Sequence, residues 1–71
     1  MTVYRTVIVV DGEVRGRIEQ DKGEAMEYAR HVARWYLGID TNTQDADTLQ
    51  ERILDDDRVA YADVAVEEVL Y

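Results

Sequence analysis

The sequence predicts an α+β fold in which a three-stranded antiparallel sheet, in the chain order β-β-α-α-β, carries its helices on one face. Three observations predict it. A run of β-branched residues ends at Asp11-Gly12 and an alternating segment follows it. A long stretch then has apolar residues at helical spacing, and the last residues of the chain are again rich in valine. Such segments with short connections are typical of one antiparallel sheet packed against helices.

Residues 2–10 and 14–20 are expected to form a β-hairpin, because Asp-Gly tolerates the positive φ that tight hairpin turns need. The second strand alternates between two sets, Val14, Gly16 and Ile18 on one side and Arg15, Arg17 and Glu19 on the other. This alternation predicts a half-buried strand with a basic outer face. A two-residue loop would pair Val9 with Val14, and a three-residue loop would pair Val10 with Val14. The sequence leaves this register open.

A long helix is expected to begin after Asp21, which has Glu24 three residues later as in a capping box, and to stop at Gly38. Its apolar positions follow the i, i+3, i+4, i+7 pattern and are Ala25, Tyr28, Ala29, Val32, Trp35, Tyr36 and Ile39. The opposite side is polar and includes the only histidine, His31, four residues from Glu27. This spacing is typical of a surface pair on a helix.

A second, shorter helix is predicted over residues 46–54, with Asp45 or Thr43 as its cap and Leu49 and Ile53 facing inward. Three consecutive aspartates, Asp55 to Asp57, would be unfavourable at the negative end of a helix dipole, so a turn is expected there. Residues 59–71 carry the third strand, with a bulge near Ala62-Asp63 where the alternation slips.

The length and composition indicate a single domain, residues 1–71, without catalytic machinery. A chain of 71 residues is near the lower limit for one hydrophobic core, so self-association is one source of extra stability, and a homodimer paired through a sheet edge is compatible with the sequence. The chain has no cysteine, no serine and no glycine-rich phosphate loop. We therefore expect no enzyme and no cofactor. No signal peptide or membrane-length apolar run is present, so a cytoplasmic location is expected.

The charge is divided unequally along the chain. The formal net charge is −8, and residues 1–39 contain six acids and six bases, whereas residues 40–71 contain ten acids against Arg52 and Arg58. A field of this sign repels nucleic acids and anionic membranes and attracts a basic partner. We expect no direct contact with nucleic acid or membrane, and we expect a basic nucleic-acid-binding protein as partner.

The acidic half supplies the candidate partner-binding residues. Carboxylates can replace phosphates as acceptors for arginine and lysine, and residues four apart on a helix form one ridge. The predicted set is Asp45, Asp47, Glu51, Asp55, Asp56 and Asp57, with Asp63 and Glu67 at its rim. The alternative is a solvated face that only keeps a small protein soluble. The sequence leaves both interpretations open.

Two segments invite a test for metal binding. Residues 40–51 have oxygen-bearing side chains at several positions of an EF-hand loop, including Glu51 at position twelve. Asp45, however, stands where the sharp turn of that loop needs glycine. Adjacent carboxylates such as Asp55 to Asp57 point in different directions and cannot all converge on a magnesium ion. We expect no metal site, although the sequence alone does not decide whether the 40–51 loop binds calcium.

In size, charge and layout the chain resembles the small, acidic, phage-encoded anti-CRISPR proteins, several of which are DNA mimics. The resemblance implies a stoichiometric inhibitor that acts in a bacterial host cell and blocks the DNA-binding groove of a CRISPR effector. An alternative is an antitoxin, or another small interaction module, that neutralises a basic partner. The hairpin followed by a helix is similar to the opening of HicB-type antitoxins, but the chain lacks their Pro-Gly segment and an appended DNA-binding domain.

Overall fold

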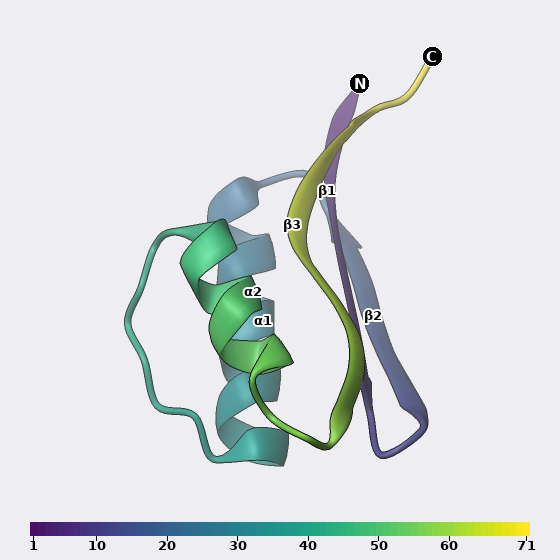
Figure 1. Cartoon of the computed structure of the whole chain (residues 1–71). Coiled ribbons are helices and arrows are strands. Elements are labelled where there is room, and N and C mark those ends of the chain that lie inside the picture. The colour runs from purple at the N-terminus through teal and green to yellow at the C-terminus, as the bar shows by residue number, and fades with distance from the viewer.

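A computed structural model describes residues 1–71 and confirms the α+β fold and the β-β-α-α-β order. Strands β1 (Thr2–Val10) and β2 (Glu13–Glu19) form the hairpin, and strand β3 (Val59–Val69) follows helices α1 (Lys22–Leu37) and α2 (Ala46–Leu54). The sheet order is β2-β1-β3, and all neighbours are antiparallel. Both helices lie on one face of the sheet, and the two chain ends lie side by side (Figure 1).

The hairpin adopts the two-residue loop. Val10 pairs with Glu13 and Val9 pairs with Val14. Asp11 and Gly12 both have positive φ, 51° and 79°, as a type I′ turn requires. This turn type matches the right-handed twist of the strands and so fixes the register that the sequence left open.

Helix α1 begins and ends where the sequence predicts. The Asp21 side chain accepts hydrogen bonds from the backbone N–H groups of Gly23 and Glu24, at 2.7 and 3.3 Å. At the other end Gly38 has a left-handed φ of 69° and its N–H donates to the Arg34 carbonyl, while the Ile39 N–H donates to the Ala33 carbonyl. Capping of this kind satisfies backbone groups that a helix end otherwise leaves without partners.

The core lies between the helices and the sheet. Its largest fully buried hydrophobic side chains are Ile8 of β1, Met26 and Val32 of α1, and Leu49 and Ile53 of α2. Three alanines of α1 spaced four apart, Ala25, Ala29 and Ala33, are also buried. Small residues in such a line let a helix backbone approach the sheet closely.

The prediction of a basic outer face on β2 is wrong, because its two sets of alternate side chains face the opposite sides from those predicted. Val14 and Ile18 pair with Val9 and Arg5, which places them on the sheet face away from the helices, and they are 68% and 64% exposed. Arg15 and Arg17 point to the helix side instead. The guanidinium carbons of Arg15 and Arg17 lie 4.1 and 5.4 Å from the ring centres of Tyr36 and Tyr28 of α1.

This pairing of arginine with tyrosine also corrects the predicted apolar face of α1. Trp35 and Tyr36 are 70% and 43% exposed, and Met26, Ala33 and Leu37 are buried in their place. The tyrosines stand at the seam between α1 and the edge strand β2, where an aromatic ring can cover a cationic side chain. Charged residues that point inward on an edge strand also discourage unwanted strand pairing.

The bulge in β3 lies further along than predicted. The register shifts between Arg5 and Val7 of β1, opposite Ala65, which has a positive φ of 49°. The hydroxyl of the fully buried Thr6 accepts a hydrogen bond from the Ala65 N–H at 3.1 Å and so satisfies the group that the bulge frees. A second shift occurs between Val9 and Val10. Neither helix is long and apolar enough to span a membrane.

Candidate functional site

Helix α2 presents an acidic ridge, which we define as Asp47, Glu51 and Asp55. Leu49 and Ile53 hold the opposite side of the helix in the core with no exposed surface. The three acids follow one another at intervals of four residues, all are exposed, and none forms an ion pair. Leu54, beside the ridge, is 45% exposed. The ridge predicted from the sequence is therefore present, with an apolar side chain next to it.

Asp45 and Asp56 lie at the two ends of α2, and their carboxylates are already engaged in hydrogen bonds within the chain. The Asp45 side chain accepts hydrogen bonds from the Thr48 hydroxyl at 2.6 Å and from the Asp47 N–H at 3.3 Å. The Thr48 hydrogen bond, the largest cause, lowers the pKa of Asp45. Asp56 binds Arg58 through both carboxylate oxygens, at 2.9 and 2.8 Å, and this side-chain hydrogen bonding lowers the pKa of Asp56 to about 2.

The turn after α2 meets the hairpin turn at one end of the molecule. The Asp11 N–H donates to the Arg58 carbonyl at 2.9 Å, and Arg58 also donates to the Leu37 carbonyl at the end of α1. Figure 1 shows the hairpin turn and the turn after α2 at the same end of the molecule, away from the two termini. We call Asp11 and Asp57, both exposed, the acidic tip. Sequence reasoning missed Asp11, although the start of β3 must lie beside the end of β1 in an antiparallel pair.

Asp63, predicted at the rim, does not join this surface, and Glu67 lies on the helix side of β3. Asp63 pairs with Val7 and lies on the open face of the sheet, where Arg5 donates to it at 2.8 Å and Tyr61 donates through its hydroxyl. The hydrogen bond from Tyr61, which is the largest cause, and the hydrogen bond from Arg5 lower the pKa of Asp63. Glu67 pairs with Tyr4 on the other face, and its carboxylate accepts a hydrogen bond from the Tyr4 hydroxyl at 3.3 Å.

The loop of residues 38–45 does not have the form of an EF-hand. Helix α2 begins at Ala46, the seventh position of the candidate loop, so Glu51 is already in its second turn. Asp45 is engaged by the helix it caps. No group of three or more histidine, cysteine, aspartate or glutamate side chains gathers closely enough to hold a metal ion.

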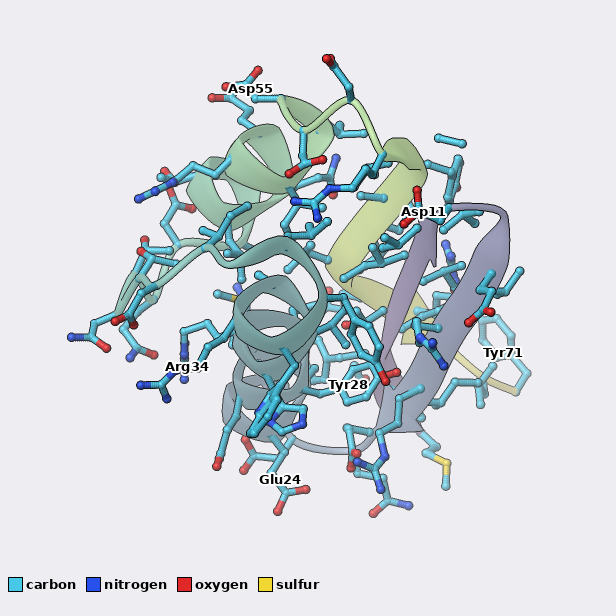
Figure 2. All side chains as sticks on the ribbon, turned by 90° about the horizontal axis from the view of Figure 1, so that it is seen from below. Asp11, Glu24, Tyr28, Arg34, Asp55 and Tyr71 are labelled. Atoms are coloured by element: carbon cyan, nitrogen blue, oxygen red, sulfur yellow. The ribbon has the colours of Figure 1, made fainter.

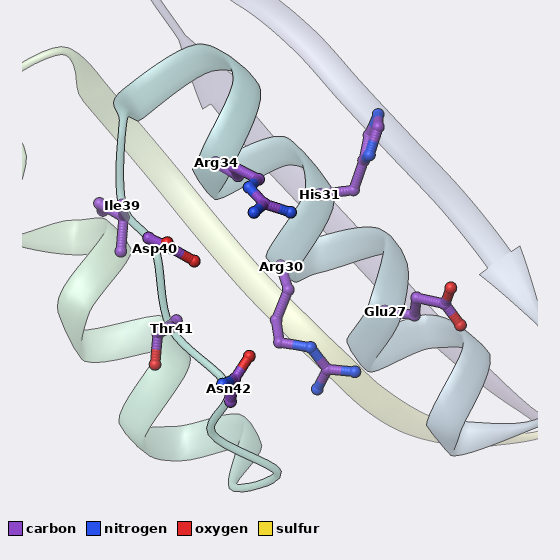
Figure 3. A pocket seen from close by; sticks show the side chains of 8 residues that line it. All are labelled: Glu27, Arg30, His31, Arg34, Ile39, Asp40, Thr41 and Asn42. Carbon is purple, nitrogen blue, oxygen red and sulfur yellow. The ribbon is translucent and has the colours of Figure 1, made fainter.

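A polar pocket of about 230 Å³ lies between α1 and the 38–45 loop (Figure 3). Arg30, His31 and Arg34 line it from α1, and Asp40, Thr41 and Asn42 line it from the loop. Arg30 donates to the Thr43 carbonyl at 3.0 Å and thereby fastens the loop to the helix. The pocket also contains Glu27 and Asp40, so acids balance its two arginines. In the sequence, the spacing of Arg30 and Arg34, four residues apart, indicates only that both side chains share one face of the helix.

No protein-family model, curated protein or solved structure matches this chain.

Proposed function

We propose that the protein is a stoichiometric inhibitor that uses the acidic ridge and the acidic tip to occupy the basic groove of a nucleic-acid-binding protein. The observation that carries the proposal is the ridge itself, three exposed carboxylates in line without an ion-pair partner. Carboxylates in this state are free to accept charge-assisted hydrogen bonds from arginine and lysine. The proposed activity is binding and needs no catalytic group.

The spacing of the ridge limits what it can replace. Residues four apart on a helix are separated by about 6 Å along the axis, whereas one DNA strand has a phosphate every 3.4 Å or so along its axis. The ridge therefore resembles a short and sparse row of phosphates, and Asp57 and Asp11 extend the negative surface at its end. We expect a partner whose arginine and lysine side chains are long enough to adapt to this spacing.

The supporting interactions make the ridge rigid. Asp45 caps the start of α2, Asp56 and Arg58 close its end, and Leu49 and Ile53 anchor its inner side. Preorganised acceptors lose little conformational freedom on binding, which favours affinity. Leu54 adds an apolar contact beside the charges, and interfaces with a buried apolar centre and a polar rim are typical of protein partners.

The experiment is a competition assay with a purified CRISPR effector, the partner class that the resemblance to acidic anti-CRISPR proteins suggests. Labelled target DNA is bound to the effector, and fluorescence anisotropy is followed as this protein is added across a salt series. We expect displacement that saturates at a fixed ratio of protein to effector and weakens as salt rises. Full DNA binding at saturating protein would reject this effector as the target.

A matched pair of variants tests the surface. The triple variant Asp47→Asn, Glu51→Gln and Asp55→Asn removes the ridge, and we expect it to weaken binding about tenfold or more. The control is Glu24→Gln, Glu27→Gln and Asp40→Asn, which changes the net charge equally and lies outside the ridge. Equal losses in both variants would mean that net charge alone attracts the partner, and the ridge would have no specific role.

A further inference from the structure

The open face of the sheet is apolar where an antiparallel sheet facing water is ordinarily polar. Its apolar members are Val7, Val9, Val14, Ile18, Tyr61 and Val66, placed there by the strand register. The helices lie on the other side of the sheet, and Tyr71 at the chain end lies on the opposite side of the sheet from Tyr28 (Figure 2). Val14, Ile18 and Tyr61 are 68%, 64% and 49% exposed, whereas Val3 at the other end of this face is buried. Exposed apolar side chains gathered on one face of so small a protein indicate an interface.

Gly16 is a second and independent observation. It stands between Val14 and Ile18, midway along the edge strand β2 and opposite Val7 of the central strand. A Cβ atom built at Gly16 would meet its nearest neighbour, the Thr6 carbonyl oxygen, at 3.5 Å, which is ordinary contact, and no positive φ is required there. The single chain therefore gives no reason for a glycine, which weakens a strand. Glycine inside a strand often marks the close approach of another backbone.

The charges on this face identify the partner class. Its charged residues are Arg5, Asp63 and Glu68, and Arg5 forms ion pairs with both acids. No carboxylate on the face is left free for a basic protein, and the net charge of −8 repels nucleic acid and anionic lipid. What remains for a partner is a nearly neutral surface with exposed apolar side chains on β2 and at Tyr61. A second copy offers the same surface with the same twist, and two such sheets stack face to face in an aligned sandwich.

We propose that the open face is a homodimer interface, in which two sheets stack through Val14, Ile18 and the hollow at Gly16. The interface is small, because three strands about 4.8 Å apart, with some seven residues of about 3.3 Å each, cover little area. We therefore expect a weak dimer near the low end of interface sizes, with a concentration-dependent mass. Both acidic ridges remain on the outer layers of this dimer.

The test is sedimentation equilibrium of the whole chain over a concentration series at low and high salt. We expect the mass to rise from that of one 8.2 kDa chain to twice that value. Salt should strengthen this association, because it screens the repulsion between two acidic chains and leaves apolar contact intact. Binding to a basic partner should weaken with salt, so failure of the dimer and failure of the proposed function are separate outcomes. A single-chain mass at every concentration would overturn the dimer proposal.

Three variants locate the interface. Ile18→Lys and Gly16→Val should each weaken association about tenfold or more, the first by adding a charge and the second by filling the hollow. Trp35→Lys, at a similarly exposed apolar residue on α1, should leave association unchanged. A dimer that both open-face variants leave intact would place the contact elsewhere, for example at a sheet edge, and would overturn the proposal.

Circular dichroism checks that each variant is folded. For the wild-type chain, isotope-filtered nuclear Overhauser effects between labelled and unlabelled copies give a direct measurement that needs no substitution. Contacts from the methyl groups of Val14 and Ile18 to the second copy support the proposal, and their absence in a sample of dimeric mass overturns it.

Discussion

The two faces of the sheet differ in a way that the composition of the strands does not suggest. On the covered face, Ile8, Val10, Ala62 and Val64 pack under the helices and are almost fully buried. On the open face, Val14 and Ile18 are 68% and 64% exposed, although Val3 at the far end of β1 is buried. Arginine, in turn, occupies the covered side of β2, where it stacks on tyrosine. The position of a strand in the sheet therefore decides its environment as much as its own pattern does.

This difference between the two faces also suggests that they have different roles. The covered face provides the stability of the single chain, and the helix layer above it presents the acidic ridge. The open face lies outside the core between helices and sheet, and its exposed Val14 and Ile18 are available to contact another molecule. Substitutions on the two faces should consequently affect different measurements.

The largest expected effect is in the core. Ile8→Ala should lower the free energy of unfolding by about 2 to 5 kcal/mol, because Ile8 is fully buried and its loss leaves a cavity. Ile18→Ala on the open face should change it by no more than about 0.5 kcal/mol when measured at low concentration. Urea denaturation of both variants gives the comparison, and similar losses would contradict the assignment of the two faces.

A smaller loss is expected for Thr6→Val, which keeps the shape of the side chain and removes its hydroxyl. The Ala65 N–H in the bulge would lose its acceptor, which costs about 1 to 3 kcal/mol for a buried group. Thr2→Val, at an exposed position of the same strand, is the matched control and should be nearly neutral. Amide hydrogen exchange at Ala65 should accelerate in the Thr6 variant alone, and unchanged exchange there would contradict the prediction.

The arginine–tyrosine stacking should give a smaller but measurable coupling. A double-mutant cycle of Arg15→Ala and Tyr36→Ala is expected to yield about 0.5 to 1 kcal/mol, the usual value for a cation–π contact near the surface. The cycle of Arg17 with Tyr28 should yield less, because that guanidinium lies 5.4 Å from the ring centre against 4.1 Å for Arg15. Zero coupling in both cycles would mean that β2 does not depend on these contacts for its orientation.

The smallest effect is expected in the pH dependence of stability that Asp63 on the open face contributes. Hydrogen bonds from Tyr61 and Arg5 lower the pKa of Asp63 in the folded protein below its usual 3.8. The stabilisation is therefore complete above the usual pKa and is lost as pH falls through the lowered value. Asp63→Asn should flatten this part of the acid unfolding curve, followed by circular dichroism, and an unchanged curve would exclude the contribution.

Much of the fold follows from local signals. The Asp11-Gly12 turn, the Asp21 cap and the Gly38 stop each have a backbone requirement that few residue types meet, and α2 begins and ends where its pattern predicts. The ridge was equally predictable, because spacing on a helix determines which side chains share a line.

The orientation of β2 was not predictable from its own alternation. In β1 both sets of alternate side chains include valine or isoleucine, so the pattern does not say which set faces the helices. A clue lay in the two-residue loop, which places Arg5 on the same face as Ile18 and so argues against burial of that face. The separation of Asp63 from the ridge likewise depends on strand register, because Asp63 pairs with Val7 on the open face.

The pairing of the chain ends has a practical consequence for fusing this protein to others. The Met1 carbonyl accepts from the Leu70 N–H at 2.7 Å, at the end of the sheet remote from the hairpin turn. The two termini are thus neighbours in the sheet, separated by about 5 Å, the spacing of paired strands. Such a module can be inserted into a surface loop of a host protein with little distortion and still project its acidic tip away from the host. For the same reason, a circular permutant opened in the 38–45 loop should fold.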